Sequence, residues 1–366
     1  MTTAVSSIAR ELSDFTHVVI HGSRNWTEET EKVKQRFPSR VSFIEWKHAG
    51  REISLVNDWK AFRELFKILK PYAKKRKDIA NPVVVHLHSS KAGFLGRLAC
   101  LVIGIKAVIY TPHCGAFLRT DIGFLKRKLY RFFEWLGSCF GGRVVGCGQS
   151  EAEIYKSLVL FRRKNSTAFV SNGVALKELK EIPASSNSVS SRRFISFTGI
   201  ASSQKDPAMW SSIAVSSADF AYEAGFSFYW VGDGPEAAYL KRDCIVLTGW
   251  KTAEEVECLL EKSAIYFSTA AWEGLPYGVL EAMNTGCALL LRDVPGNRDL
   301  VISGENGWLF NTQEEARDRL AIMLKDRNRL EAMGKKSREI IRQNYTLKQM
   351  GEGYRKIYSE ASSLLR

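Results

Sequence analysis

The sequence predicts an α/β protein with two doubly wound parallel sheets, and two observations support that prediction. Short apolar, β-branched runs alternate with helix-like segments along most of the 366 residues. Continuous apolar strands that alternate with helices are typical of parallel sheets covered on both faces. A Ser-rich polar stretch, residues 178–194, interrupts this alternation and predicts a boundary between two domains of similar size. Ligands of such sheets bind beyond the carboxyl ends of the strands, so we expect the site in a cleft between the domains.

The expected strands follow in chain order, each an apolar run that closes on small or polar residues. They lie at residues 17–22, 83–89, 106–113, 142–150 and 167–174 in the first half, and at residues 193–199, 226–234, 244–250, 264–272 and 287–293 in the second. The Gly-x-Gly of "GCGQSE" lacks the third glycine of a dinucleotide-binding fingerprint, so that interpretation is rejected. Arg97 is expected on the surface of a helix.

Composition narrows the class of partner. The net charge of +14 favours an anionic partner, which would be nucleic acid, a phosphorylated ligand or an anionic membrane surface. No nucleic-acid partner is expected, because the basic residues are dispersed and no RNA-binding aromatic motif is present. Seven cysteines without a CxxC pair indicate buried thiols in a reducing compartment. With no signal peptide and no apolar run long enough to span a bilayer, the protein is expected to be cytoplasmic. The histidines show no metal-ligand spacing, so neither metal nor cofactor is expected.

The stretch "AWEGLPYGVLEAMNTG", residues 271–286, carries the strongest chemical signal. Glu273 stands in a Gly/Pro turn after a strand, and Glu281 stands inside the helix that follows. The start of that helix offers N–H groups and partial positive charge to a phosphate. A carboxylate accepts two hydroxyl donors, which suits a vicinal diol. The stretch therefore predicts a nucleotide-sugar site; the alternative is an ordinary turn between strand and helix with one solvated glutamate and one that complements the helix dipole.

A wider set of motifs carries a family resemblance. "EGLPYGVLEAMNTGCALLL", with "GNRDLV" and "GENGWLF" after it, closely resembles the retaining GT-B glycosyltransferases of group 1, family four, in particular those that build surface polysaccharides. Segments such as "HLHSSKAGFLGRLA", "VIYTPHCGAF", "FTGIASSQKDP" and "YWVGDGPE" agree with it in order. The resemblance implies two Rossmann-like domains facing a cleft. It places an acceptor-binding domain at residues 1–177, a linker at 178–192, a nucleotide-sugar-binding domain at 193–344, and a last helix at 345–366 that returns to the first domain.

The resemblance also implies roles for single residues. Glu281 would hold the ribose hydroxyls, Glu273 the sugar hydroxyls, and Lys205 the leaving diphosphate, with His113 beside the donor sugar. The remaining donor-binding positions are Gly199, Gly274, Leu275, Pro276 and Tyr277 near the diphosphate, and Gly249 and Trp250 near the base. The alternatives stay open: Lys205 could be a solvated side chain, His113 a structural histidine in a tight turn, and Asp233 part of a plain turn.

The implied reaction transfers a hexose from a nucleoside diphosphate to a saccharide or polyprenyl-linked acceptor with retained configuration. No protein nucleophile is established for this class. The implied course is a front-side displacement in which a donor phosphate oxygen takes the acceptor proton, without metal or cofactor. Two alternatives remain: a sugar-nucleotide epimerase of similar fold, and a catalytically silent nucleotide-sugar-binding protein.

Two departures from the family pattern favour the silent alternative. Ile200 stands where the family usually has an arginine that joins the later lysine on the diphosphate. The chain also opens on a helix that leads to what resembles the second strand, so the first strand and its Gly-Gly loop are expected to be missing. We therefore expect donor binding with poor transfer.

Residues 117–140 predict an amphipathic helix with a basic side. Apolar residues recur at helical spacing, namely Leu118, Ile122, Leu125, Leu129, Phe132, Phe133 and Leu136, with Lys126, Arg127, Lys128 and Arg131 around them. Packing of the apolar stripe into the first domain accounts for most of these positions. The basic side, together with "KKRK" at 74–77, could dock on an anionic membrane surface.

Overall fold

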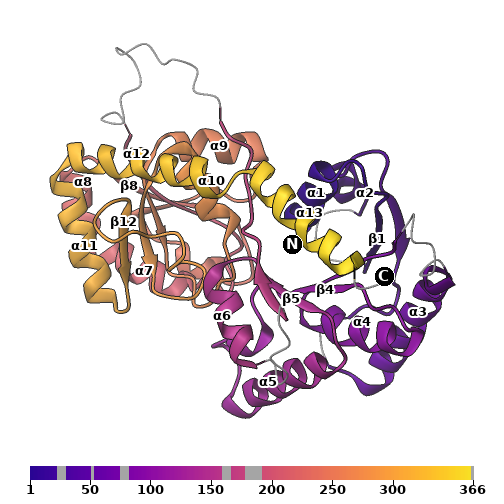
Figure 1. Cartoon of the computed structure of the whole chain (residues 1–366). Coiled ribbons are helices and arrows are strands. Elements are labelled where there is room, and N and C mark those ends of the chain that lie inside the picture. Colours follow the sequence, from indigo (N-terminus) through magenta and orange to yellow (C-terminus); the bar gives the residue numbers. More distant parts are fainter. Residues whose placement is uncertain (23–29, 51–52, 75–81, 159–165, 178–191, 364–366) are drawn as a thin grey trace. The chain divides into compact units, whose positions relative to one another are not determined.

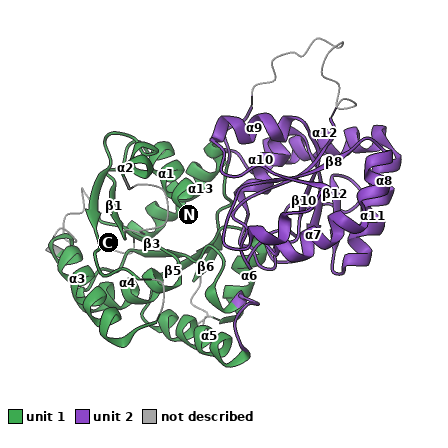
Figure 2. Ribbon diagram, turned by 180° about the vertical axis from the view of Figure 1, so that it is seen from behind, with its two compact units in different colours: residues 1–117, 124–173, 347–366 green, residues 118–123, 174–346 purple. Residues whose placement is uncertain are grey.

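A computed structural model describes residues 1–22, 30–50, 53–74, 82–158, 166–177 and 192–363 (Figure 1). The chain forms two compact units (Figure 2). Unit 1 comprises residues 1–117, 124–173 and 347–366, and unit 2 comprises residues 118–123 and 174–346. Of the predicted linker at 178–192, all but Arg192 lies outside the described residues, as do Lys75 to Lys77 of the "KKRK" run.

Unit 1 contains a sheet of four parallel strands in chain order. These are β3 (Val85–His88), β4 (Val108–Thr111), β5 (Arg143–Gly146) and β6 (Thr167–Phe169). The helices that pack beside one another along this sheet are α3 (Leu55–Lys74), α4 (Ser90–Ile103) and α5 (Phe124–Cys139). α6 (Gln149–Leu158) packs against β5 and β6. A short 3-10 helix, Ala116–Leu118, follows β4. Strands were predicted at all four of these places.

A second, two-stranded parallel sheet lies in the same unit. It pairs β1 (Val18–His21) with β2 (Ser42–Glu45), with α1 (Thr2–Glu11) before it and α2 (Thr30–Gln35) within it. The sequence prediction missed β2, because four residues with a half-buried centre and exposed ends give no clear periodicity. Among the described residues, no strand joins this sheet to β3–β6.

The last helix, α13 (Leu347–Ser363), packs against α1 on the face of unit 1 opposite α3, α4 and α5 (Figures 1 and 2). Tyr354 and Tyr358 of α13 are buried in one core cluster with Leu12, which follows α1, and Ile109 of β4. The helices come so close that a Cβ on Gly351 would lie 2.6 Å from the Cβ of Glu11. The last helix therefore belongs to unit 1, although the chain before it belongs to unit 2.

Unit 2 is a six-stranded parallel sheet with the order β12-β11-β10-β7-β8-β9. The strands are β7 (Phe194–Thr198), β8 (Ser227–Val231), β9 (Ile245–Leu247), β10 (Ser263–Ser268), β11 (Ala288–Arg292) and β12 (Gly307–Phe310). One group of packed helices comprises α7 (Pro207–Ser216), α8 (Ala218–Glu223) and α11 (Gln313–Lys325), and the other comprises α9 (Ala253–Glu261), α10 (Tyr277–Thr285) and α12 (Arg327–Asn344). Figure 1 shows the two groups on opposite faces of the sheet. A short 3-10 helix, Ala237–Leu240, follows β8.

The order of these strands locates the binding edge. From β7 the chain runs outward to β8 and β9, then returns to the other side of β7 with β10 and continues to β11 and β12. The carboxyl ends of β7 and β10 therefore flank the point where the strand order reverses, which is where ligands bind in open parallel sheets. Every residue of β10 is buried, so the sheet centre is rigidly packed beneath that point.

Arg97 corrects one sequence expectation. It is only 2% exposed and lies between α4 and α5, with its guanidinium 4.5 Å from the Tyr110 ring centroid and 3.4 Å from the Glu134 carboxylate. The Tyr110 hydroxyl donates to the other Glu134 oxygen at 2.8 Å. Gly137 of α5 leaves room for this side chain, since a Cβ there would lie 2.4 Å from a guanidinium nitrogen of Arg97. A buried charge is tolerated here because both ions have hydrogen-bond partners.

Candidate functional site

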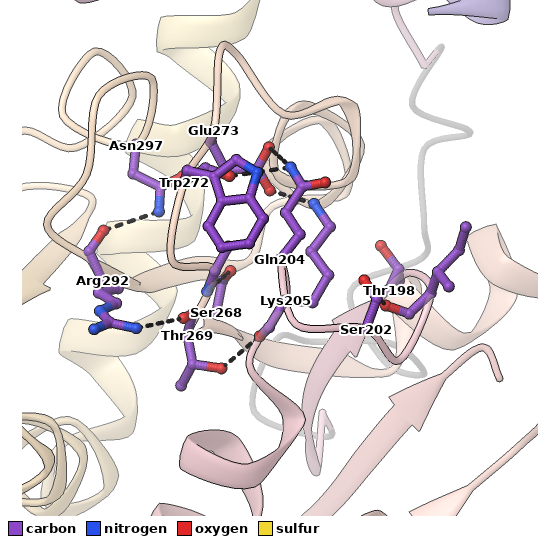
Figure 3. A network of polar contacts seen from close by, with 12 residues as sticks. Thr198, Ser202, Gln204, Lys205, Ser268, Thr269, Trp272, Glu273, Arg292 and Asn297 are labelled. Carbon is purple, nitrogen blue, oxygen red and sulfur yellow. Dashed lines mark hydrogen bonds and ion pairs between the residues drawn. The ribbon is translucent and has the colours of Figure 1, made fainter. Parts of the chain in front are cut away.

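The loops that follow β7 and β10 hold two predicted site residues against each other. Lys205 forms an ion pair with Glu273, and their side chains are only 20% and 8% exposed (Figure 3). Thr269 donates from Oγ1 to the carbonyl oxygens of Lys205 and Asp206, both at 2.9 Å. Gln204 donates from Nε2 to the Trp272 carbonyl oxygen at 3.0 Å. These contacts tie the two loops together at the point where the strand order reverses.

This pairing gives Lys205 a partner that the sequence did not predict. Ile200 leaves Lys205 without the second cation that the family pattern provides, and the partner that Lys205 contacts here is the acidic Glu273. Ile200 itself is 41% exposed. A diphosphate that binds Lys205 must therefore compete with the Glu273 carboxylate for the ammonium group.

The start of α10 lies beside the end of β7. Thr198 Oγ1 and Tyr266 Oη share a hydrogen bond of 3.0 Å, and a Cβ on Gly278 would come within 2.6 Å of that Thr198 oxygen. Pro276 is the N-cap of α10 and has no side-chain capping bond. The partial positive charge of this helix end thus adjoins the Lys205–Glu273 pair, as expected for the segment Gly274, Leu275, Pro276 and Tyr277.

The turn before α10 packs against a second loop, the one that follows β11. A Cβ on Gly296 would collide with the Gly274 carbonyl oxygen, so the two backbones touch, and the φ of +85° at Gly296 favours glycine as well. Asn297 is fully buried and donates from Nδ2 to the Arg292 carbonyl oxygen at 2.9 Å. Gly286 ends α10 in the left-handed conformation, which glycine adopts without a steric penalty.

Glu281 lies in the second turn of α10. More than a third of the residue is exposed, yet the protein around its carboxyl group raises the pKa to about 7. The nearby carboxylate of Glu257 in α9 adds to this shift, because two like charges disfavour ionisation. Glu281 is therefore poised to change charge near neutral pH.

The loops that follow β7, β8 and β9 pack against one another. Gly199 donates its N–H to the Val231 carbonyl oxygen at 2.9 Å, and Gly232 lies so close to Gly199 that a Cβ would collide with its carbonyl oxygen. Gly249 pairs with Gly232 in an antiparallel bridge, and the neighbouring Trp250 is 65% exposed. The indole is thus available for stacking on a flat ligand.

Asp233 accepts the N–H of Gly234 at 2.8 Å, which fits the plain-turn alternative for that residue.

The loop after β7 also borders a cavity of about 350 Å³ in unit 2. Its lining includes Ser203, Asp206, Ala271 and Arg292. Arg292 pairs with Asp206 at 3.0 Å there.

Unit 1 holds a cluster of three histidines at the ends of β3 and β4. His88 Nδ1 and His113 Nε2 share a hydrogen bond of 2.9 Å, and their rings stack with centroids 5.2 Å apart. His86 contacts the Tyr358 hydroxyl at 2.8 Å and the Thr111 hydroxyl at 2.9 Å. Burial lowers the pKa of His88 to about 3 and that of His113 well below its usual range, so both rings are neutral at pH 7.

The predicted site residues thus fall into two groups. His113 belongs to unit 1, and the predicted donor residues, Gly199, Lys205, Gly249, Trp250, Glu273 to Tyr277 and Glu281, belong to unit 2. The sequence interpretation missed Gln204, Glu257 and Glu151. The signal for Glu151 was its place just after a strand in "GCGQSE", a motif that was weighed only as a nucleotide fingerprint.

Three further properties of the described residues concern metal-ligand groups, disulfide bonds and membrane-spanning helices. Within the described ranges, no group of three or more His, Cys, Asp and Glu side chains is arranged to hold a metal ion. All seven cysteines are free thiols, and Cys100, Cys147 and Cys287 are buried. In the same ranges no helix combines the length and the apolar character needed to cross a bilayer.

Comparisons with known proteins give both sequence and structural relatives. Residues 233–340 match the family model described as "Glycosyl transferases group 1". An Escherichia coli UDP-Gal:alpha-D-GlcNAc-diphosphoundecaprenol alpha-1,3-galactosyltransferase is 29% identical over 287 residues, which are 72% of this chain and 69% of the relative. An uncharacterized 41.2 kDa protein in the cps region of Klebsiella pneumoniae is 26% identical over 63% of this chain and 66% of its own.

Two solved structures can be superimposed on almost the whole chain. Sucrose-phosphate synthase from Thermosynechococcus elongatus matches with a TM-score of 0.73 at 14% identity, covering 97% of this chain and 93% of its own. Anabaena HepE in complex with UDP and glucose also matches with a TM-score of 0.73, at 13% identity, covering 98% and 95%. At such low identity these likenesses establish the fold alone.

Proposed function

We propose that this chain, which belongs to the group 1 glycosyltransferases and has the GT-B fold, transfers a hexose from a nucleoside-diphosphate sugar with retained configuration. The family match over residues 233–340 and the solved structures confirm the group and the fold class that the motifs indicated. The chain is thus a glycosyltransferase. The stereochemistry, the donor and the acceptor are parts of the proposal.

One observation supports the proposal most strongly. The loops after β7 and β10 bring a lysine, a buried carboxylate and a helix start to the point where the strand order of unit 2 reverses. The lysine and the helix start suit a diphosphate, and the carboxylates Glu273 and Glu281 suit sugar and ribose hydroxyls.

The mechanism we propose is a front-side displacement. Lys205 exchanges Glu273 for the donor diphosphate and stabilises the charge that develops on the leaving group. Glu273, once released, accepts hydroxyl groups of the sugar. The acceptor oxygen forms the new glycosidic bond as the bond to the diphosphate breaks, and a diphosphate oxygen takes the acceptor proton. The protein thus supplies orientation and charge stabilisation rather than a nucleophile.

The relatives narrow the substrates that we propose. The E. coli relative is named for UDP-galactose and an N-acetylglucosamine diphosphoundecaprenol acceptor, and the Anabaena structure holds UDP and glucose. We therefore place a UDP-hexose in unit 2 and a polyprenyl-diphosphate saccharide as acceptor, in surface polysaccharide synthesis.

The test combines the purified chain with UDP-galactose and α-N-acetylglucosaminyl-diphosphoundecaprenol. The expected result is a lipid-linked disaccharide with an α linkage, identified by mass spectrometry and NMR, and its loss in Glu273→Gln. UDP binding without transfer from any of UDP-galactose, UDP-glucose and their N-acetyl forms would favour the silent binding protein. Conversion of the nucleotide sugar into its epimer would favour the epimerase.

An anionic membrane surface is the second partner that we propose, and α5 is the observation that favours it. Phe124, Leu125, Leu129 and Phe132 are 65%, 81%, 44% and 49% exposed. The alternative that the stripe packs inside the domain is therefore wrong for Leu125, Leu129 and Phe132, while Leu118, Ile122, Phe133 and Leu136 are half-buried. The basic residues of α5 are exposed beside them, namely Lys126, Arg127, Lys128 and Arg131.

Such a mixed basic and apolar face suits the inner surface of the cytoplasmic membrane, where a polyprenyl-linked acceptor would reside. Liposome flotation tests this surface. Binding to vesicles with anionic lipid should fade with salt and with substitution of the four basic residues of α5 by glutamine. A matched control removes four exposed lysines of unit 2, Lys241, Lys262, Lys325 and Lys335. Equal binding to neutral vesicles, or equal loss in the control, would refute the electrostatic docking.

A further inference from the structure

Glu151 is a fully buried carboxylate that connects two loops of unit 1. It lies in the first turn of α6, and its Oε1 accepts the N–H of Cys114 at 2.6 Å while its Oε2 accepts the N–H of Cys147 at 2.8 Å. The first of these amides follows β4 and the second follows β5. The carboxylate thus uses one oxygen for each loop, at a place where solvent does not reach it.

The tight approach of α6 to the sheet makes this contact possible. A Cβ on Gly146, the last residue of β5, would lie 2.7 Å from the backbone nitrogen of Ala152. With glycine there, the first turn of α6 lies directly against the strand end, and Glu151 reaches both amides.

The loop after β4 needs such support because its backbone is unusual. His113 and Cys114 have φ angles of 53° and 74°, and both are non-glycine residues in the left-handed region. Consecutive side-chain-bearing residues rarely adopt this conformation, and it persists only where the surroundings impose it. The Cys114 amide held by Glu151 belongs to this turn, so the carboxylate helps to set where His113 points.

The imidazole of His113 is fixed a second time through its ring. Its Nε2 shares a hydrogen bond with His88 Nδ1, and the two rings stack with an interplanar angle of 21°. The backbone next to His113 is therefore held by the buried Glu151, and its ring by the half-buried His88.

We propose that Glu151 is a positioning residue that fixes the His113 turn, and through it the His113 imidazole, for the transfer reaction. This inference rests on the proposed function for the role of His113, whereas the fixing of the turn stands on the geometry alone. Glu151 holds backbone amides of unit 1, and the predicted nucleotide-binding residues are in unit 2. Loss of its carboxylate should therefore lower turnover and leave nucleotide affinity unchanged.

The test replaces the carboxylate by an amide of the same shape, Glu151→Gln. The NH2 group of the glutamine would then face one of the two backbone N–H groups, of Cys114 or Cys147, and could not accept its hydrogen bond. Glu153→Gln is the matched control, since it removes the same charge from an exposed position of the same helix. The first measurement is the imidazole ¹⁵N NMR spectrum, assigned with His88→Gln and His113→Ala. We expect the ring signals of His113 and His88 to shift and broaden in Glu151→Gln and to match wild type in Glu153→Gln.

The second measurement is UDP release from UDP-galactose with the lipid-linked acceptor, beside the Kd for UDP. We expect turnover to fall at least tenfold in Glu151→Gln with the Kd within twofold of wild type. A residue that acts through His113 should add nothing in its absence, so Glu151→Gln combined with His113→Ala should equal His113→Ala alone. Glu151→Asp, which keeps the charge but is too short to span both amides, should show the same ring shifts and serves if the glutamine variant does not fold.

Unchanged ring signals in a folded Glu151 variant would overturn the proposal. A double variant whose turnover is lower than that of His113→Ala by the full factor of Glu151→Gln would overturn it as well. Full turnover by His113→Ala would instead refute the role of His113 in the proposed function. The ring signals would then still decide whether Glu151 fixes the turn.

Discussion

Donor binding should depend on the ionisation of Glu281, and the structure gives the pH at which the change occurs. The pKa of this carboxyl group is raised to about 7 by the protein around it, which displaces water, and by the charge of Glu257. A ribose diol donates hydrogen bonds to the carboxylate, so the ionised form binds the donor and the protonated form binds it less well. Affinity should therefore rise as the pH increases through 7 and level off above it.

The size of the effect follows from the same pKa. About one tenth of Glu281 is ionised at pH 6 and about nine tenths at pH 8, so affinity should change about tenfold over this range. Hydrogen bonds to a charged group contribute about 1.5–3 kcal/mol, so Glu281→Ala should weaken donor binding by roughly 10- to 150-fold at pH 8. Glu281→Gln should bind weakly and without pH dependence in this window.

The assay is isothermal titration calorimetry with UDP-galactose between pH 6 and 8. The sugar nucleotide is preferred to UDP because its diphosphate has no group that titrates in this range. Glu257→Gln is the informative control, because removal of that neighbouring charge should move the midpoint to lower pH. A wild-type affinity that is flat from pH 6 to 8, or a pH dependence that survives in Glu281→Gln, would refute the reasoning.

A loss of stability in Glu281→Gln should not interfere with this measurement. A carboxyl group whose pKa is raised in the folded state binds its proton more tightly there than in the unfolded chain. Its contribution to stability is therefore lost as the pH rises from about 4.5 to about 7. Glu281→Gln removes that loss, so its melting temperature at pH 8 should equal or exceed that of wild type.

Four further changes test unit 2. Lys205→Ala should weaken UDP binding measured by calorimetry, and Ile200→Arg should strengthen it; no effect of the new arginine would mean that the diphosphate binds elsewhere. Glu273→Gln should leave UDP affinity equal or higher, because Lys205 loses its competing partner, while turnover falls; a large loss of UDP affinity would contradict this assignment. Gly278→Ala should destabilise unit 2 by about 1–3 kcal/mol in urea unfolding, since its Cβ would press on Thr198, whereas Gly123→Ala, with open space around it, should not.

The sequence by itself determined the features that depend on neighbouring residues. Ten strands were predicted from apolar runs that closed on small or polar residues, because this signal is local. The same local pattern placed Glu273 in a turn and Glu281 in a helix. It failed for β2, whose ends are exposed and whose centre is only half-buried, and for β12.

Only the tertiary structure decided which side chains meet. Lys205 and Glu273 are 68 positions apart, and Glu151 and Cys114 are 37 apart, so no local pattern could pair them. The order β12-β11-β10-β7-β8-β9 brings the first pair together, and the packing of α6 on β5 brings the second. Burial also depends on tertiary packing. Arg97 is covered because α5 packs over it, and Leu125, Leu129 and Phe132 are exposed because α5 turns Glu134 and Gly137 inward. A helical period shows that residues share a face, but the energy of burying that face depends on what the rest of the chain packs against it.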